Sequence, residues 1–107
     1  MYGTIARMRV KPGMEDRLRS MSQEEANLNI PGFIGQYVYR MDHDPNEYYM
    51  VVLFRDRETY VVNAHDPEQD ARYRQMLQFL DGEPEWHDGE IVDSFIPSTT
   101  GMPGMTM

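Results

Sequence analysis

Two polar side chains interrupt helical stripes that are otherwise apolar, and they are therefore candidates for chemistry. Glu25 continues the stripe of Met21 at helical spacing. A carboxyl group enclosed in a pocket has a raised pKa and could act as a general base. Tyr73 lies on the inner stripe of a later helix, where its hydroxyl could donate a hydrogen bond to a substrate oxygen. Each has an ordinary interpretation as well: Glu25 reaches water from the rim, and Tyr73 packs in the core with its hydroxyl at the surface.

Asn63 and the three histidines are the remaining candidates. Asn63 ends a short predicted helix, where its amide could orient a substrate carbonyl or could cap its own backbone. His65 lies between two predicted helical pieces and is the acid–base candidate among the histidines, although beside Asp66 it could equally be a surface loop residue. His43 is expected to be exposed in a turn. His87 is expected at a dimer edge.

The composition excludes several other kinds of chemistry. The 107 residues include no cysteine, which rules out disulfides, thiolate metal sites and a cysteine nucleophile. No histidine pair has metal-ligand spacing, so we expect no metal site. The net charge of -8 disfavours nucleic acids and anionic membranes as partners. No apolar run approaches the roughly 18 residues of a membrane span, and the expected location is the cytoplasm.

The elements that must position these residues alternate between strand and helix patterns. Period-two alternation indicates a strand, and apolar residues three or four apart indicate a helix. The chain predicts a strand over 2–10, a helix from 14 to about 28, strands over 33–41 and 48–54, helices over 57–64 and 67–80, and a strand over 86–95. The predicted order is βαββαβ, an α+β domain over residues 1–96 whose four-stranded antiparallel sheet carries helices on one face. Residues 97–107 are expected to form a flexible tail.

The third predicted strand is apolar on both faces, which has a consequence for assembly. Tyr48, Met50, Val52 and Phe54 alternate with Tyr49, Val51 and Leu53. Two helical segments can cover only one face of the sheet, so we expect a second copy of the sheet to cover the other, forming a homodimer. The alternative is a monomer with an exposed aromatic patch. Arg7 and Arg9 would lie on the open face, and we expect them to pair with acidic residues of the partner.

Several short motifs resemble those of the antibiotic-biosynthesis-monooxygenase family, in the same order and over roughly residues 1 to 95. They are Ala6 to Gly13, Pro31 to Gly35, Asp44 to Glu47 and Val51 to Glu58, with Phe54 in place of a frequent Trp. The resemblance implies a ferredoxin-like monomer, a dimeric α/β barrel and a pocket between sheet and helices. Some members of the family oxidise aromatic polyketides or quinols with molecular oxygen and without metal or flavin, whereas others degrade haem.

For this chain, the resemblance implies a cofactor-independent monooxygenase that acts on a small phenolic or quinol substrate. The catalytic candidates are Tyr73, Asn63 and His65. A small aromatic ligand would lie in a pocket lined by Glu25, Met8, Met21, Tyr37 and Met76, in which methionines supply adaptable walls. Two alternatives remain open: a non-catalytic dimeric domain with a ligand-binding or structural role, and an isomerase of the same superfamily.

The residues at three positions argue against haem degradation. Haem-degrading members of the family use an Asn on the first strand, a Trp on the short helix and a His on the long helix. The matching residues here are Ala6, Asn63 and Tyr73, so no axial histidine is left for the iron.

Overall fold

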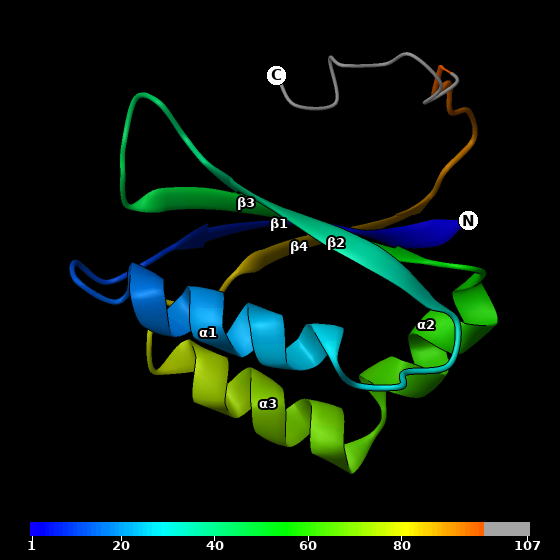
Figure 1. The fold of residues 1–107 in the computed structure, drawn as a ribbon, viewed down its shortest axis with the longest axis horizontal. Helices are drawn as coiled ribbons and strands as arrows, with labels where there is room; N and C mark the ends of the chain where they lie inside the picture. The colour runs from blue at the N-terminus through cyan, green and yellow to red at the C-terminus, as the bar shows by residue number, and fades with distance from the viewer. Residues whose placement is uncertain (98–107) are drawn as a thin grey trace.

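The computed structural model describes residues 1–97, so all but the first residue of the expected tail lies outside the described residues. Seven elements follow one another (Figure 1): β1 Tyr2–Arg9, α1 Glu15–Ala26, β2 Phe33–Arg40, β3 Glu47–Phe54, α2 Arg57–Ala64, α3 Pro67–Leu77 and β4 Glu85–Glu90. The strands form one antiparallel sheet in the order β2-β3-β1-β4. This is the ferredoxin-like α+β arrangement, and the predicted fold class is confirmed.

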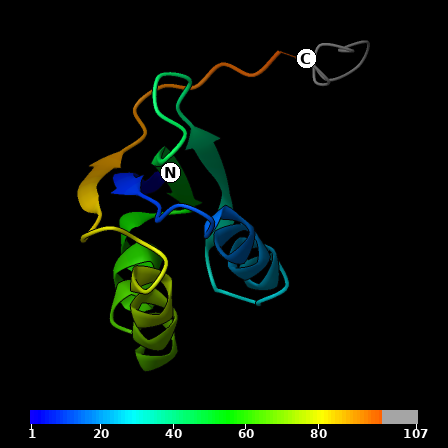
Figure 2. The ribbon, with the colours of Figure 1, turned by 90° about the vertical axis from the view of Figure 1, so that its left-hand side faces the viewer.

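The helices all lie on one side of the sheet. Figures 1 and 2 show α1 and α3 side by side beneath the strands, with α2 at one end of the sheet. No helix within residues 1–97 is long and apolar enough to cross a membrane. The two-layer arrangement leaves one face of the sheet covered and the other open.

The caps at the starts of α2 and α3 explain where these helices begin. The side chain of Asp56 accepts a hydrogen bond from the backbone N–H of Thr59 at the start of α2. Asp66 does the same for Glu68 at the start of α3, where Pro67 occupies the first turn and loses no helical hydrogen bond. Both starts agree with the predicted ones.

The predicted ends of two elements were wrong. Helix α1 ends at Ala26, within two residues of the predicted end, so Leu28 lies just outside it and is exposed. Helix α3 ends at Leu77, and the next residues form a turn in which the backbone N–H of Lys11 donates to the Phe79 carbonyl. Strand β4 ends at Glu90 instead of residue 95 because Glu90 pairs with Tyr2, the first residue of β1, and the sheet offers no further partner.

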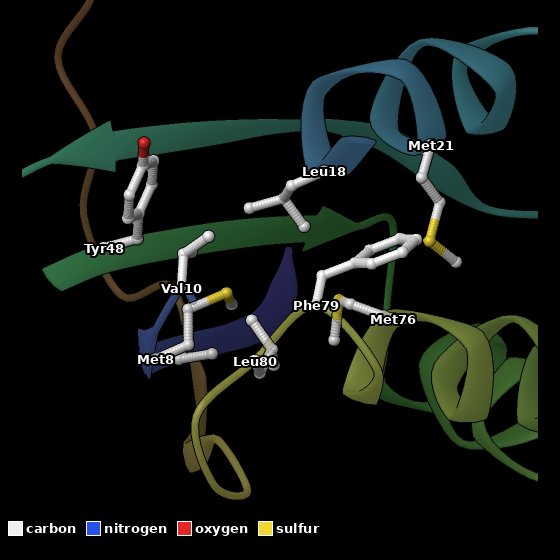
Figure 3. Close-up of a cluster of buried hydrophobic side chains, with 9 residues drawn as sticks. Met8, Val10, Leu18, Met21, Tyr48, Met76, Phe79 and Leu80 are labelled. Carbon is white, nitrogen blue, oxygen red and sulfur yellow. The ribbon is translucent and has the colours of Figure 1, made fainter. Parts of the chain in front are cut away.

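The core lies between the helices and β1, the strand that pairs with both β3 and β4. Alternate side chains of β1 point toward the helices, and Ala6 and Met8 are buried there. Figure 3 shows the buried cluster, whose labelled members come from β1, α1, β3 and α3 and from the residues that directly follow β1 and α3: Met8, Val10, Leu18, Met21, Tyr48, Met76, Phe79 and Leu80. Gly3 approaches β3 so closely that any Cβ would overlap the Val52 carbonyl oxygen.

The two arginines of the open face form ion pairs within the chain, and their pairing with acidic residues of a partner subunit stays a prediction. The guanidinium of Arg7 donates to the carboxylate of Glu47 at 2.8 Å, and Arg9 donates to Asp44 at 2.8 Å. The imidazole Nε2 of His43, an exposed residue as expected, lies 2.8 Å from the second oxygen of Glu47. These acidic residues belong to the β2–β3 hairpin, next to β1.

Glu47→Gln is expected to lower the melting temperature at neutral pH by a few degrees. The hydrogen bond from Arg7 is the main reason that the pKa of Glu47 lies below its usual value, and His43 also lowers it. A carboxyl group with a lowered folded pKa contributes stability that is present above its unfolded pKa and is lost as the pH falls through the folded pKa. Thermal melts against pH should therefore show the two proteins converging in acid. A constant difference at every pH would contradict this account.

Candidate functional site

Two adjoining cavities lie between the helices and the covered face of the sheet. The first, which we call the α1 cavity, has a volume of about 340 Å³ and is lined mainly by Met8, Leu18, Met21, Ser22, Val38 and Tyr48. The second, the α3 cavity, has a volume of about 280 Å³ and is lined mainly by Thr4, Phe33, Val52, Tyr60, Asn63, Arg72, Tyr73 and Trp86. Glu25, Gln36, Met50 and Met76 line both cavities and form a shared wall.

Glu25 is the ionisable group of this shared wall. Helix α1 places it one turn after Met21, which is buried in the core, so the carboxyl group is carried inward and is half-buried. Burial raises the pKa of Glu25 above its usual value, and the positive charge of Arg72 on α3 partly opposes that rise. The result is a carboxyl group that accepts a proton more readily than an exposed one, although the positive charge of Arg72 limits the rise in its pKa.

Two side-chain hydrogen bonds link the elements around the cavities. The amide of Gln36 donates to the Ser22 hydroxyl at 2.7 Å across the wall. The hydroxyl of Tyr60 donates to Asp88 at 2.8 Å, and burial together with that bond raises the pKa of Tyr60 to about 12. Tyr60 therefore stays protonated at neutral pH and ties α2 to β4 at one end of the cavity.

Most of the residues proposed from the sequence line one of the two cavities. Tyr73 and Asn63 line the α3 cavity, and the Tyr73 ring lies 5.8 Å from the Trp86 ring between centroids. The other residues that line a cavity are Glu25, Met8, Met21 and Met76. Tyr73 and Asn63 come from α3 and α2, so the turn at Asp66 brings them to one wall.

The structure places two proposed residues outside both cavities. Tyr37 alternates with Gln36 and Val38 on β2, so its side chain points to the open face, where it is 65% exposed. His65 ends α2 as its C-cap and is exposed, with its Nδ1 3.0 Å from the Val61 carbonyl oxygen. Within residues 1–97, no group of three or more acidic or histidine side chains is arranged to hold a metal ion.

Sequence reasoning missed Thr4, Gln36, Tyr60 and Arg72. A signal for Thr4 was available, because it alternates with Ala6 on the buried face of β1 and is the polar member of that face. Arg72 lies one helical turn before Met76, at the spacing that places both on one side of α3. Both residues are polar positions on an apolar face, the same criterion that singled out Glu25.

Comparison with known proteins identifies the family. The sequence model of the antibiotic biosynthesis monooxygenases matches residues 1–72, and the chain belongs to that family. No curated protein matches the chain.

Solved structures with low sequence identity share the fold. SnoaB, a cofactor-independent oxygenase from Streptomyces nogalater determined with one asparagine replaced by alanine, has a TM-score of 0.73 at 14% identity, covering 91% of this chain and 97% of its own. A candidate antibiotic biosynthesis monooxygenase from Chloroflexus aurantiacus has a TM-score of 0.70 at 21% identity, covering 91% and 98%. A conserved protein from Methanosarcina mazei has a TM-score of 0.70 at 19% identity, covering 82% and 89%.

Proposed function

We propose that this protein is a cofactor-independent monooxygenase that oxidises a small phenolic or quinol substrate in the cavities beneath its sheet. The observation that carries the proposal is Glu25, a half-buried carboxyl group with a raised pKa on the wall shared by both cavities. Oxygenation without a cofactor requires the substrate to be ionised, because an electron-rich anion can give an electron to oxygen. A base of this kind is what the reaction requires of the protein.

In the proposed reaction, the carboxylate of Glu25 takes the proton of the substrate hydroxyl. The resulting anion transfers one electron to molecular oxygen, and the two radicals combine to form a carbon–oxygen bond. Loss of water then leaves a quinone, so that one oxygen atom enters the substrate and the other leaves as water. The positive charge of Arg72, which lines the α3 cavity, stabilises the oxyanion.

The surroundings of Glu25 support this assignment of roles. Tyr73 and Asn63 line the α3 cavity, where a hydroxyl and an amide can orient the substrate oxygens. The family to which the chain belongs, and the description of SnoaB as a cofactor-independent oxygenase, favour the same chemistry.

Oxygen uptake tests the proposal directly. Purified protein in a metal-chelating buffer without flavin is given a panel of hydroquinones and anthrones, and oxygen consumption is followed. We expect at least one substrate to be consumed at a rate proportional to protein concentration, with one oxygen molecule used for each quinone formed. Rates equal to those of buffer across the panel, with the same compounds bound, would support a non-catalytic ligand-binding domain instead.

We also propose that two copies pair through the open face of the sheet. That face carries Ile5, Tyr37 and Tyr39, which are 49%, 65% and 53% exposed in the single chain. Val51 and Leu53 lie between them on β3, because the register pairs Val51 with both Ile5 and Tyr37. An apolar surface that spans three neighbouring strands is typical of an interface.

A further inference from the structure

Residues 22–29, the second half of α1 and the turn after it, contain no buried side chain, although they contribute to the walls of both cavities. The first half of the helix differs, because Leu18 and Met21 are buried in the core. In the segment, only Ser22 and Glu25 are half-buried against the cavities, and the other six residues are exposed. Buried apolar side chains are what hold most helices in place, so this part of α1 is held weakly.

The charges at this end of the helix weaken it further. Glu24 and Glu25 lie in the last turn of α1, which contains no basic residue. The carbonyl end of a helix carries partial negative charge, so two carboxylates destabilise the final turn. Glu25 also loses hydration at its half-buried position, and movement of the segment away from the sheet would return its carboxylate to water. Arg72 of α3 is the charged group that opposes this movement.

The residues that flank the segment are fixed. On one side, Met21 is 7% exposed in the core. On the other, the backbone N–H of Arg55 donates to the Gly32 carbonyl at 2.7 Å, and any Cβ at Gly32 would overlap the side chain of Thr59. Figure 1 shows the chain between α1 and β2 passing beside α2. The weakly held segment therefore connects two anchored points.

One side-chain hydrogen bond within residues 1–97 joins the segment to the sheet. The amide of Gln36, on the edge strand β2, donates to the Ser22 hydroxyl at 2.7 Å. Both side chains line the α1 cavity, so this bond closes its wall between helix and strand. The other side-chain hydrogen bond of the segment, from Asn27 to the Gln23 carbonyl, lies within it.

We propose that residues 22–29 form a gate that opens to admit a ligand to both cavities, with Met21 and Gly32 as its fixed ends and the Gln36–Ser22 hydrogen bond as its latch. Opening breaks one side-chain hydrogen bond to the sheet and exposes no buried apolar side chain of the segment, so it requires far less free energy than unfolding. The inference rests on the proposed function in one respect, that ligands enter these cavities. The gate itself can be measured without a substrate.

Hydrogen exchange measures the gate in the full chain. Ser22→Ala removes the acceptor of the latch, and it is expected to speed exchange of the amides of residues 22–28 about threefold while leaving those of β1 unchanged. Ser20→Ala is the matched control, because Ser20 is exposed on the same helix and lines neither cavity. Alanine favours a helix more than serine does, so without a latch both substitutions would slow exchange.

A thiol placed in the cavity wall gives a second readout, since the chain has no cysteine of its own. Met76 is 8% exposed and lines both cavities, so Met76→Cys is expected to react with dipyridyl disulfide when the gate opens. Adding Ser22→Ala should speed this reaction about threefold. Val10 is 2% exposed and lines neither cavity, so Val10→Cys reports opening of the core, and its reaction rate should not change with Ser22→Ala.

Three results would overturn the gate. They are equal exchange rates in Ser22→Ala and Ser20→Ala, a thiol reaction of Met76→Cys that Ser22→Ala does not speed, and an equal acceleration at Val10→Cys, which would mean that the whole core opens. Oxygen uptake is decided separately. A gate that passes these tests in a protein that consumes no oxygen would stand while the proposed oxygenase failed, and oxygen uptake without a gate would leave the oxygenase intact.

Discussion

Glu25→Gln is expected to lower kcat for oxygen consumption by about 100-fold or more, because a general base contributes roughly 10²–10⁴ to a rate. Glutamine keeps the shape of the side chain but cannot take the substrate proton. For the unaltered protein, the rate should rise with pH through the raised pKa of Glu25, since only its ionised form acts as a base. The variant should lose that step from its pH–rate profile.

Glu25→Gln should raise the stability of the folded protein at neutral pH, although it lowers kcat. A carboxyl group whose folded pKa is raised above the ordinary value of 4.5 binds its proton more tightly in the folded chain than in the unfolded one. Stability therefore falls as the pH rises from the unfolded pKa through the folded pKa, and it stays lower above that window. At neutral pH, Glu25→Gln removes this cost, so we expect a higher melting temperature than that of the unaltered protein, with the difference vanishing in acid.

Glu24→Gln is the matched control for both measurements. Glu24 is the exposed neighbour of Glu25 on α1, so the substitution makes the same change of charge outside the cavities. It should leave both kcat and the melting temperature close to those of the unaltered protein. Full activity in Glu25→Gln, or equal losses in the two variants, would remove Glu25 from the mechanism.

Ile5→Asp is expected to separate the proposed dimer into single chains of 12.6 kDa. Ile5 lies on the central strand β1 and is 49% exposed in the single chain, so the substitution leaves the core of each protomer intact. In a dimer that pairs through the open face, each protomer would bury an unpaired carboxylate, which costs several kcal/mol per ion. Association should weaken by about 100-fold or more, as measured by sedimentation or light scattering over a range of concentrations.

Val62→Asp is the corresponding control, because Val62 on α2 is 65% exposed and lies away from the sheet. It should keep the mass of two chains. Circular dichroism of Ile5→Asp should match that of the unaltered protein, which separates loss of association from loss of folding. A single-chain mass for the unaltered protein would contradict the dimer at the outset.

Local signals were sufficient to predict the order and class of the elements. The acidic cap and proline at Asp66 and Pro67 mark the start of α3, and alternation marks β1. The end of β4 was missed because no residue within it stops the strand. It stops where β1 runs out of residues to pair with, which is a property of the register and not of the local sequence.

The site was harder to predict for a related reason. Periodicity identified Glu25 and Tyr73 as polar residues on apolar faces, but which elements meet around a cavity depends on packing. Arg72 and Thr4 are 68 positions apart in the chain and come together only when α3 lies beneath β1. Tyr37 was placed in the pocket because the alternation of faces along the strand was not applied to it. Successive residues of a strand point to opposite faces of the sheet, so Tyr37 points to the open face.

The methionine side chains around the cavities also determine how the site would be inactivated by oxidation. Met8, Met21 and Met76 are each less than a tenth exposed, so an oxidant in solution has little access to their sulfur atoms. A peroxide released from a substrate inside the cavities would meet these sulfurs first and convert them to sulfoxides, which are polar and would disturb the core. Oxidative damage would then begin at the cavity walls and not at the protein surface, because each turnover that releases peroxide would oxidise residues that bind the substrate.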